Sequence, residues 1–192
     1  MNSKISLIMS GVIACALLSS CASKQVPPQA GMQVSFVTVH HSVFHVPVNA
    51  TYQWSAGFSR QVAAGRLYSV DMWGLLKQGI EAEMQMKGYR KVGSAEQADI
   101  NISFVAALAS TLDDAEIQQK YGLVPGLMVH QVDQRRYEKG TLVFDVVNPK
   151  THKLAWRTAG QALATLEKVP VADRKARIAV FVKKLLAFLP EK

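Results

Sequence analysis

The stretch from Tyr137 to Ala164 constrains the fold most, because two runs of alternating apolar residues flank one cluster of turn-forming residues. The pattern predicts a β-hairpin that turns at Asn148-Pro149-Lys150-Thr151. Since side chains alternate along a strand, one face of this hairpin is apolar. It carries Leu142, Phe144, Val146, Leu154 and Trp156. A face of this kind has to be covered by a second apolar layer.

The opposite face of the predicted hairpin carries Asp145 on the first strand and Arg157 on the second. With a turn of five or six residues, these two side chains lie diagonally or directly opposite each other. We therefore expect a cross-strand charge pair, which stabilises a sheet by roughly 0.2–1 kcal/mol.

Two amphipathic segments can supply the covering layer. The first predicted helix spans residues 71–87, with Ser69 or Asp71 as its N-cap and Gly88 after its last turn. Its apolar stripe consists of Met72, Leu75, Leu76, Ile80 and Met84, with Trp73 at the edge. Glu83 and Lys87 are spaced to form an ion pair on its exposed side.

The second predicted helix runs from Pro170 to Leu189, and Pro190 is expected to end it. Its apolar side consists of Ile178, Phe181, Val182, Leu185, Phe188 and Leu189. Five cations occupy its polar side and its start: Arg174, Lys175, Arg177, Lys183 and Lys184.

Three further segments read as strands because their apolar residues alternate. The first begins at Val34, the second is a short extended piece from Thr51 to Trp54, and the third runs from Asp99 to Leu108 and is expected to be internal. With 49% hydrophobic residues, the chain can build one sizeable core. The sequence therefore predicts a single α+β domain: a twisted antiparallel β-sheet, including strands near 100–108, 141–147 and 153–160, with two helices packed on one face.

Between residues 110 and 136 the pattern is weak. A short helix is expected from Leu112 to Tyr121, with Asp113 and Asp114 in its first turn. We predict that this segment is a mobile or partner-contacting loop.

The first twenty residues predict export. Lys4 precedes an uncharged apolar run from Ile5 to Leu18, which is shorter than the roughly 20 residues that span a bilayer. Leu18-Ser19-Ser20-Cys21 resembles the lipobox of bacterial lipoproteins, in which cleavage precedes a cysteine that carries acyl chains such as palmitate. The expected organisation is a signal peptide at 1–20, a tether at 21–33 lipidated on Cys21, and a folded domain at 34–192.

This organisation predicts a compartment and a set of partners. Ala22 follows the cysteine where lipoproteins retained in the inner membrane typically have Asp, so we expect attachment to the outer membrane on its periplasmic side. The chain has 22 Lys and Arg against 14 Asp and Glu, and losing Lys4 lowers its net charge from +8 to +7. Expected partners are the membrane, anionic lipid, lipopolysaccharide, cell-wall polymers and envelope proteins. Nucleic acid is not expected, because no basic motif is interleaved with aromatic residues.

Few residues suggest a catalytic or metal-binding role. His40, His41 and His45 lie close together and raise a metal or proton-sensing hypothesis, although no cysteine or carboxylate lies nearby in the sequence, so surface histidines are the simpler interpretation. Asp113, Asp114 and Glu116 are candidate acid–base groups, but acidic residues are ordinary at a helix N-terminus and no second cluster completes a mechanism. No G-x-S-x-G, H-E-x-x-H or S-x-x-K motif is present.

These observations predict a non-enzymatic binding or accessory module without catalytic residues, metal or cofactor. The alternatives are a ligand or metal carrier that uses the histidines, or an enzyme with an unrecognised site.

Several short motifs, taken in order, resemble the domain-of-unknown-function family numbered 4136. They are the lipobox at Cys21, Tyr52 with Trp54, Lys87-Gly88-Tyr89, Ala98-Asp99, Glu138-Lys139-Gly140-Thr141-Leu142 with Asp145, Leu154-Ala155-Trp156-Arg157, and Phe188-Leu189-Pro190. The resemblance implies a small bacterial lipoprotein with an α+β domain. It implies no activity and no catalytic residue. Thr158-Ala159-Gly160 and the histidine-rich stretch at 40–45 depart from the family pattern.

Overall fold

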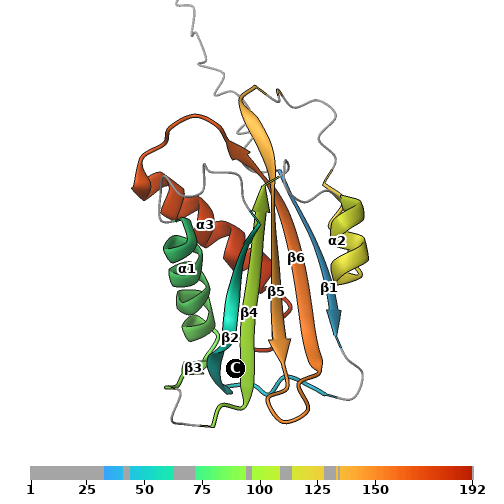
Figure 1. The fold of residues 1–192 in the computed structure, drawn as a ribbon. Coiled ribbons are helices and arrows are strands. Elements are labelled where there is room, and N and C mark those ends of the chain that lie inside the picture. Colours follow the sequence, from blue (N-terminus) through green and yellow to red (C-terminus); the bar gives the residue numbers. More distant parts are fainter. Residues whose placement is uncertain are drawn as a thin grey trace, which may run out of the picture.

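A computed structural model describes residues 33–40, 44–62, 72–93, 97–108, 114–127, 133 and 135–191. Within these residues it contains six strands and three helices (Figure 1). In chain order they are β1 Val34–His40, β2 Thr51–Val62, α1 Met72–Met86, β3 Arg90–Lys91, β4 Ile100–Leu108, α2 Asp114–Tyr121, β5 Tyr137–Val147, β6 Leu154–Thr165 and α3 Val171–Leu185. Among the described helices, none has the length and apolar character needed to span a bilayer.

The six strands form one mixed sheet in the order β1-β6-β5-β4-β2-β3. The predicted antiparallel pairing holds for β1, β6, β5 and β4. It is wrong for β2, which pairs in parallel with both β3 and β4. Parallel neighbours need a crossover, and α1 lies between β2 and these two partners in the chain. The combination of helices and strands is consistent with the predicted α+β class.

The predicted hairpin is confirmed as β5 and β6, which pair with Phe144 opposite Thr158 and Val146 opposite Trp156. The predicted place of Leu154 beside Trp156 on the apolar face is wrong, because a register shift next to Val146 sets Leu154 opposite Val147, and Ala155 lies in the core cluster instead. Its turn closes through two backbone bonds, from Asn148 N to the Lys153 carbonyl (2.9 Å) and from His152 N to the Asn148 carbonyl (2.9 Å). His152 has a φ of 56°, so the chain passes through the left-handed region there.

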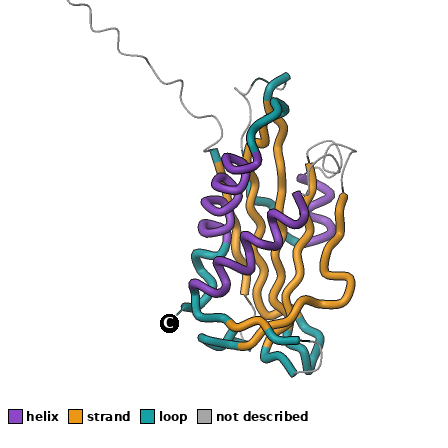
Figure 2. Tube along the Cα trace, turned by 90° about the vertical axis from the view of Figure 1, so that its left-hand side faces the viewer, coloured by secondary structure: helices purple, strands orange, loops and turns teal. Residues whose placement is uncertain are grey.

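The main core lies between the sheet and two helices. Phe144 and Trp156 share one buried cluster with Leu76, Ile80 and Met84 of α1 and with Ile178, Val182 and Leu185 of α3. Figure 2 shows α1 and α3 side by side in front of the strands. Burial of apolar side chains in such a core is the main contribution to the stability of a domain.

The predicted apolar stripe of the first helix lies in this core, and Trp73 stacks on Phe104 with ring centroids 4.3 Å apart. Gly88 follows the helix with a φ of 93°, as predicted for a C′ glycine. The proposed caps Ser69 and Asp71 lie outside the described residues. β2 extends to Val62, well beyond the short Thr51–Trp54 piece expected from sequence.

Gly160 lets two aromatic rings approach the sheet. A Cβ atom at this position would lie 2.7 Å from the Phe36 ring of β1 and 2.8 Å from the Phe181 ring of α3. These two rings pack against each other with centroids 5.3 Å apart. A residue with a side chain would therefore push apart the contact that joins α3 to β1.

The C-terminal region differs from the prediction. α3 ends at Leu185 instead of Leu189, so Pro190 is not its stop signal. Phe188, expected in the apolar stripe, is 76% exposed, because the chain has left the helix before reaching it, whereas Leu189 is buried.

Contacts with Lys87 explain why the chain leaves the helix after Leu185. Its Nζ donates to the Leu189 carbonyl (3.1 Å) and pairs with Glu191 (2.9 Å). The Tyr89 hydroxyl donates to the Pro190 carbonyl (2.8 Å), and burial raises the pKa of Tyr89 to about 12. The predicted Glu83–Lys87 pair is therefore wrong: Lys87 is only 5% exposed and binds the C-terminal residues instead.

Candidate ligand pocket

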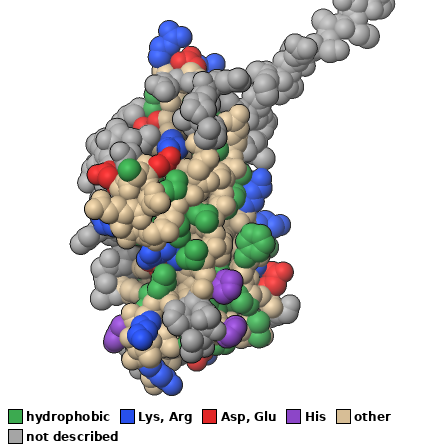
Figure 3. Space-filling view, turned by 90° about the vertical axis from the view of Figure 1, so that its right-hand side faces the viewer, with side chains coloured by type: hydrophobic (Ala, Val, Ile, Leu, Met, Phe, Trp, Pro, Cys, Tyr) green, Lys and Arg blue, Asp and Glu red, His purple; other side chains and the backbone are tan. Residues whose placement is uncertain are grey.

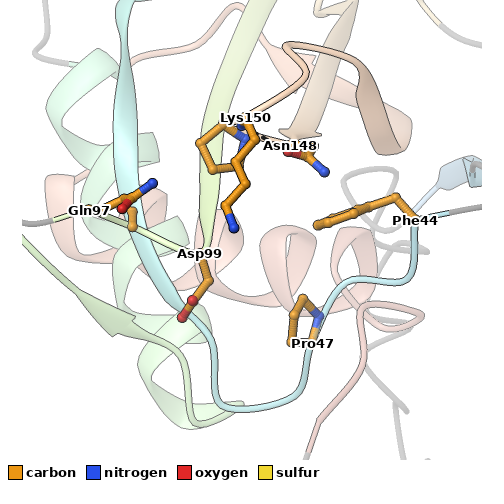
Figure 4. A pocket seen from close by; sticks show the side chains of 8 residues that line it. Phe44, Pro47, Gln97, Asp99, Asn148 and Lys150 are labelled. Atoms are coloured by element: carbon orange, nitrogen blue, oxygen red, sulfur yellow. Dashed lines mark hydrogen bonds between the residues drawn. The ribbon is translucent and has the colours of Figure 1, made fainter.

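A pocket of about 400 Å³ opens at the end of the sheet where β1 ends and where the turn between β5 and β6 lies. Three loops meet there, as Figure 4 shows: the connection between β1 and β2, the loop before β4, and the β5–β6 turn. The lining residues are Phe44, Pro47, Gln97, Ala98, Asp99, Asn148, Pro149 and Lys150. Cavities of this volume are typical of small-molecule sites.

The β5–β6 turn fixes the backbone of Lys150. The Asn148 side-chain oxygen accepts hydrogen bonds from the backbone N–H groups of Lys150 (2.8 Å) and Thr151 (3.2 Å), as in an Asx turn. In Figure 4 the Lys150 side chain extends from this turn into the space between Asp99 and Phe44. The turn that the sequence predicts thus holds a cation at the mouth of the pocket.

The start of β4 fixes Asp99 in a similar way. One carboxylate oxygen, Oδ2, accepts from both the backbone N–H (2.8 Å) and the hydroxyl (2.7 Å) of Thr51 at the start of β2. The Asp99 N–H donates back to the Thr51 hydroxyl (3.0 Å). These bonds, from backbone and then side chain, hold the pKa of Asp99 below its ordinary value, helped by the charges of Arg90 and Lys150. Asp99 is therefore a fixed anion at neutral pH.

The pocket combines two opposite charges with apolar walls. No ion pair within 4.0 Å joins Asp99 to Lys150, and neither the Oδ1 atom of Asp99 nor the Nζ atom of Lys150 makes a hydrogen bond within the described part of the chain. Phe44, Pro47 and Pro149 provide apolar surface between and around them. This arrangement can bind a ligand that carries a positive charge at one end, next to Asp99, and a negative charge at the other, next to Lys150.

The second face of the sheet carries a polar cluster that holds residues 114–127. Arg157 donates two hydrogen bonds of 2.6 Å to Asp145, confirming the predicted pair, and a third of 3.0 Å to the Tyr121 carbonyl. These bonds to Asp145 raise the pKa of Arg157, although burial opposes the charge. The sequence predicted the pair but missed its third partner, because Tyr121 is far from Arg157 in the chain.

A second set of bonds fixes the same segment. Gln161, which is fully buried, donates to Asp114 (2.7 Å) and accepts from the Leu127 N–H (3.0 Å). Lys139 donates to both Asp114 oxygens (2.8 Å each), and the Ser35 hydroxyl donates to the Pro125 carbonyl. Residues 114–127 are thus attached to the sheet by hydrogen bonds, which does not fit a mobile loop in this part of 110–136, whereas partner contact by this segment stays a prediction.

These contacts bear on the acid–base hypothesis. Burial disfavours the charged form of Asp114, but the bonds from Lys139 and Gln161 outweigh it and lower the pKa of this carboxyl. Through these bonds Asp114 anchors α2 to the sheet, and an acid–base role for it stays a prediction. Glu116 is exposed on α2, and Asp113 lies outside the described residues.

The histidines do not form a described site. His40 ends β1 and is exposed, His45 is exposed in the β1–β2 connection, and His41 lies outside the described residues. Figure 3, which faces the β1 side of the molecule, shows histidine side chains on the surface. Among the described residues, no group of three histidine, cysteine or acidic side chains could hold a metal ion. The three-histidine hypothesis stays a prediction, as does lipidation at Cys21, which also lies outside the described residues.

Sequence reasoning missed the pocket. The Asn148-Pro149-Lys150 turn and the strand beginning at Asp99 were each visible. Their convergence with Phe44 and Pro47 depends on the packing of three loops that are separated by about fifty residues in the chain. No short sequence pattern indicates that residues so far apart in the chain lie next to each other.

Comparison with known proteins finds one matching family model and several solved structures of low sequence identity. A family model described as "Domain of unknown function (DUF4136)" matches residues 30–191. Among curated proteins, none is significantly similar in sequence.

Three solved structures illustrate the distant similarity. A PelC dodecamer from Paraburkholderia phytofirmans is 7% identical, with 83% of this chain and 99% of that chain covered and a TM-score of 0.49. A DUF4136 family protein from Bacteroides thetaiotaomicron is 12% identical, with 83% and 99% covered and a TM-score of 0.48. A PDZ domain protein from Parabacteroides distasonis is 14% identical, with 83% and 36% covered and a TM-score of 0.43.

Proposed function

The chain belongs to the DUF4136 family, whose function is unknown, and from that premise we propose that it is a lipid-anchored lipoprotein of the outer membrane that faces the periplasm. It acts there as a non-enzymatic binding or accessory module. Its binding site is the pocket lined by Asp99 and Lys150.

The relative position of the tether and the pocket carries this proposal. The lipobox places the lipid on Cys21, and residues 22–33, with Pro27, Pro28 and Gly31, have the composition of a tether. The described fold begins beside the Ala162 end of β6, because Val34 pairs with Ala162. The pocket lies at the other end of the sheet, where His40 pairs with Trp156 and where the β5–β6 turn is located. In Figure 1 this is the lower end of the sheet. The pocket therefore lies at the end of the domain opposite to the one where the tether joins it.

The types of side chain in the pocket support binding over catalysis. The eight lining residues include one carboxylate and one ammonium group, which can hold complementary charges. Apart from Asp99 and Lys150 themselves, they include no side chain that commonly serves as a base or nucleophile.

Replacing Cys21 with serine is expected to abolish lipidation. A hydroxyl is a far weaker nucleophile than a thiol, so the acyl chains are not attached and the protein no longer sediments with membranes. Metabolic labelling with a radioactive fatty acid, followed by membrane fractionation, checks this. Cys15→Ser is the matched control and should change neither result, because Cys15 lies within the predicted leader. Retention of label in Cys21→Ser would contradict the anchor.

The basic residues of α3 provide a second contact with the membrane. Arg174, Lys175 and Arg177 lie in the first half of the helix, and the last two are exposed. The helix follows the Thr165 end of β6, which is the end where Val34 enters the fold. An exposed cation next to an anionic bilayer contributes about 1 kcal/mol, and the effect fades beyond a Debye length of about 8–10 Å.

We expect the full chain carrying Cys21→Ser to co-sediment with anionic vesicles at low salt. Further replacement of Arg174, Lys175, Arg177, Lys183 and Lys184 by glutamine should remove most of this binding. A variant with Lys150→Gln and Lys153→Gln, two cations at the pocket end, is the control. Equal binding of all variants, or equal binding to neutral vesicles, would show that the charge of α3 does not attract lipid.

A further inference from the structure

We propose that the pocket binds a small zwitterion, an α-amino acid or the equivalent part of a short peptide, with its carboxylate on Lys150 and its ammonium group on Asp99. This inference rests on the proposed binding function and names the class of ligand. The carrying observation is a fixed anion and a cation that line one cavity without pairing with each other.

The anion is held so that one oxygen stays available. Both bonds from Thr51 go to the Oδ2 atom of Asp99, which leaves Oδ1 to accept from a ligand. A preorganised acceptor loses little entropy when a ligand binds.

The cation has a neighbour suited to a carboxylate. Asn148 uses its side-chain oxygen in the turn, so its NH₂ group is the free half of the amide. In Figure 4 this nitrogen points away from the turn toward the Phe44 side of the pocket, where Lys150 also extends. An ammonium and an amide donor on one side match the two oxygens of a carboxylate. The Gln97 amide lies at the Asp99 side and offers a further polar contact.

The walls fit an apolar side chain on the ligand. The Phe44 ring projects toward the centre of the pocket in Figure 4, and Pro47 and Pro149 add rigid apolar surface. Binding is stabilised when these surfaces exchange their contacts with water for contacts with a hydrocarbon group of the ligand.

The charges disfavour other ligand classes. Asp99 repels the double negative charge of a phosphate more strongly than the single charge of a carboxylate bound to Lys150. A free amine without an acid group would leave Lys150 as an uncompensated like charge. A divalent cation needs several oxygen ligands, and the lining residues supply one carboxylate beside a lysine.

The test is equilibrium dialysis of the full chain, purified from membranes in detergent, against radiolabelled L-leucine, L-phenylalanine and D-alanine. We expect saturable binding of at least one of them at one site. The N-acetyl derivative, which lacks the ammonium group, and the carboxamide, which lacks the carboxylate, should each bind roughly threefold to fivefold more weakly, as expected when an ion pair with an exposed side chain is lost. Inorganic phosphate should not compete.

Two variants assign the ends of the ligand. Lys150→Gln should weaken binding of the free amino acid roughly threefold to fivefold and remove the preference for the free acid over the carboxamide. Asp99→Asn keeps an oxygen for Thr51 but loses the charge, so it should remove the preference for the free amine over the N-acetyl derivative. Lys153→Gln is the matched control, because Lys153 is exposed on the same turn and does not line the pocket; its affinity should not change.

Three outcomes would overturn the ligand assignment: no saturable binding of any of the three amino acids, equal binding of the N-acetyl derivative, or equal weakening by Lys153→Gln. Fatty-acid labelling of the same preparations reports on the anchor independently. A labelled, membrane-bound protein that fails in dialysis therefore refutes the zwitterion and leaves the anchoring intact.

Discussion

Replacing Trp156 with alanine is expected to lower the free energy of unfolding by about 3–5 kcal/mol. Trp156 is 4% exposed and packs edge-to-face on Phe144, with ring centroids 6.0 Å apart and an interplanar angle of 71°. It lies in the cluster that joins the sheet to α1 and α3. Removing the indole leaves a cavity that the surrounding helices and strands can fill only in part.

Urea denaturation of the full chain in detergent, followed by circular dichroism, measures this loss. Phe188→Ala is the matched control, because it also truncates an aromatic side chain, but one that is 76% exposed. The control should change stability by less than about 0.5 kcal/mol. A loss below about 1 kcal/mol for Trp156→Ala would mean that this residue is not part of the core.

Replacing Arg157 with methionine is expected to cost about 2–3 kcal/mol. Arg157 and Asp145 are each only 18% exposed, so the variant leaves a largely buried carboxylate without its two hydrogen bonds. It also removes the donor to the Tyr121 carbonyl, which helps to hold α2 on the sheet. Methionine keeps much of the apolar volume, so the loss reports on the polar contacts.

Arg136→Met is the control for this measurement. Arg136 pairs with Glu167 at 3.0 Å, but the two side chains are 57% and 59% exposed. Exposed pairs of this kind contribute about 0–1 kcal/mol. Limited proteolysis should also cut within residues 114–127 sooner in Arg157→Met than in Arg136→Met. Equal effects of the two substitutions would show that burial of the Arg157 pair is unimportant.

The hairpin was predictable because its determinants are local. Alternation fixed which face of β5 and β6 is apolar, and the Asn148-Pro149-Lys150-Thr151 cluster fixed the turn and the pairing of Asp145 with Arg157. The apolar stripe of α1 and the C′ position of Gly88 followed from helical spacing and from the need for a positive φ.

The C-terminal error has a clear physical cause. Helical spacing continues through Phe188 and Leu189 in the sequence, but Lys87 and Tyr89 bind the carbonyl groups of Leu189 and Pro190. Tertiary hydrogen bonds therefore override the local preference and end the helix at Leu185.

By itself, the sequence determined the elements whose signals lie within a few residues of each other: β1, α1, β4, the β5–β6 hairpin and most of α3. Only the tertiary structure decided the parallel pairing of β2, the attachment of residues 114–127 to the second face, and the meeting of Phe44, Asp99 and Lys150 in one pocket. These features join residues that are tens of positions apart. Their formation depends on how the packed layers bring loops together, and alternation or helical periodicity carries no information about such contacts.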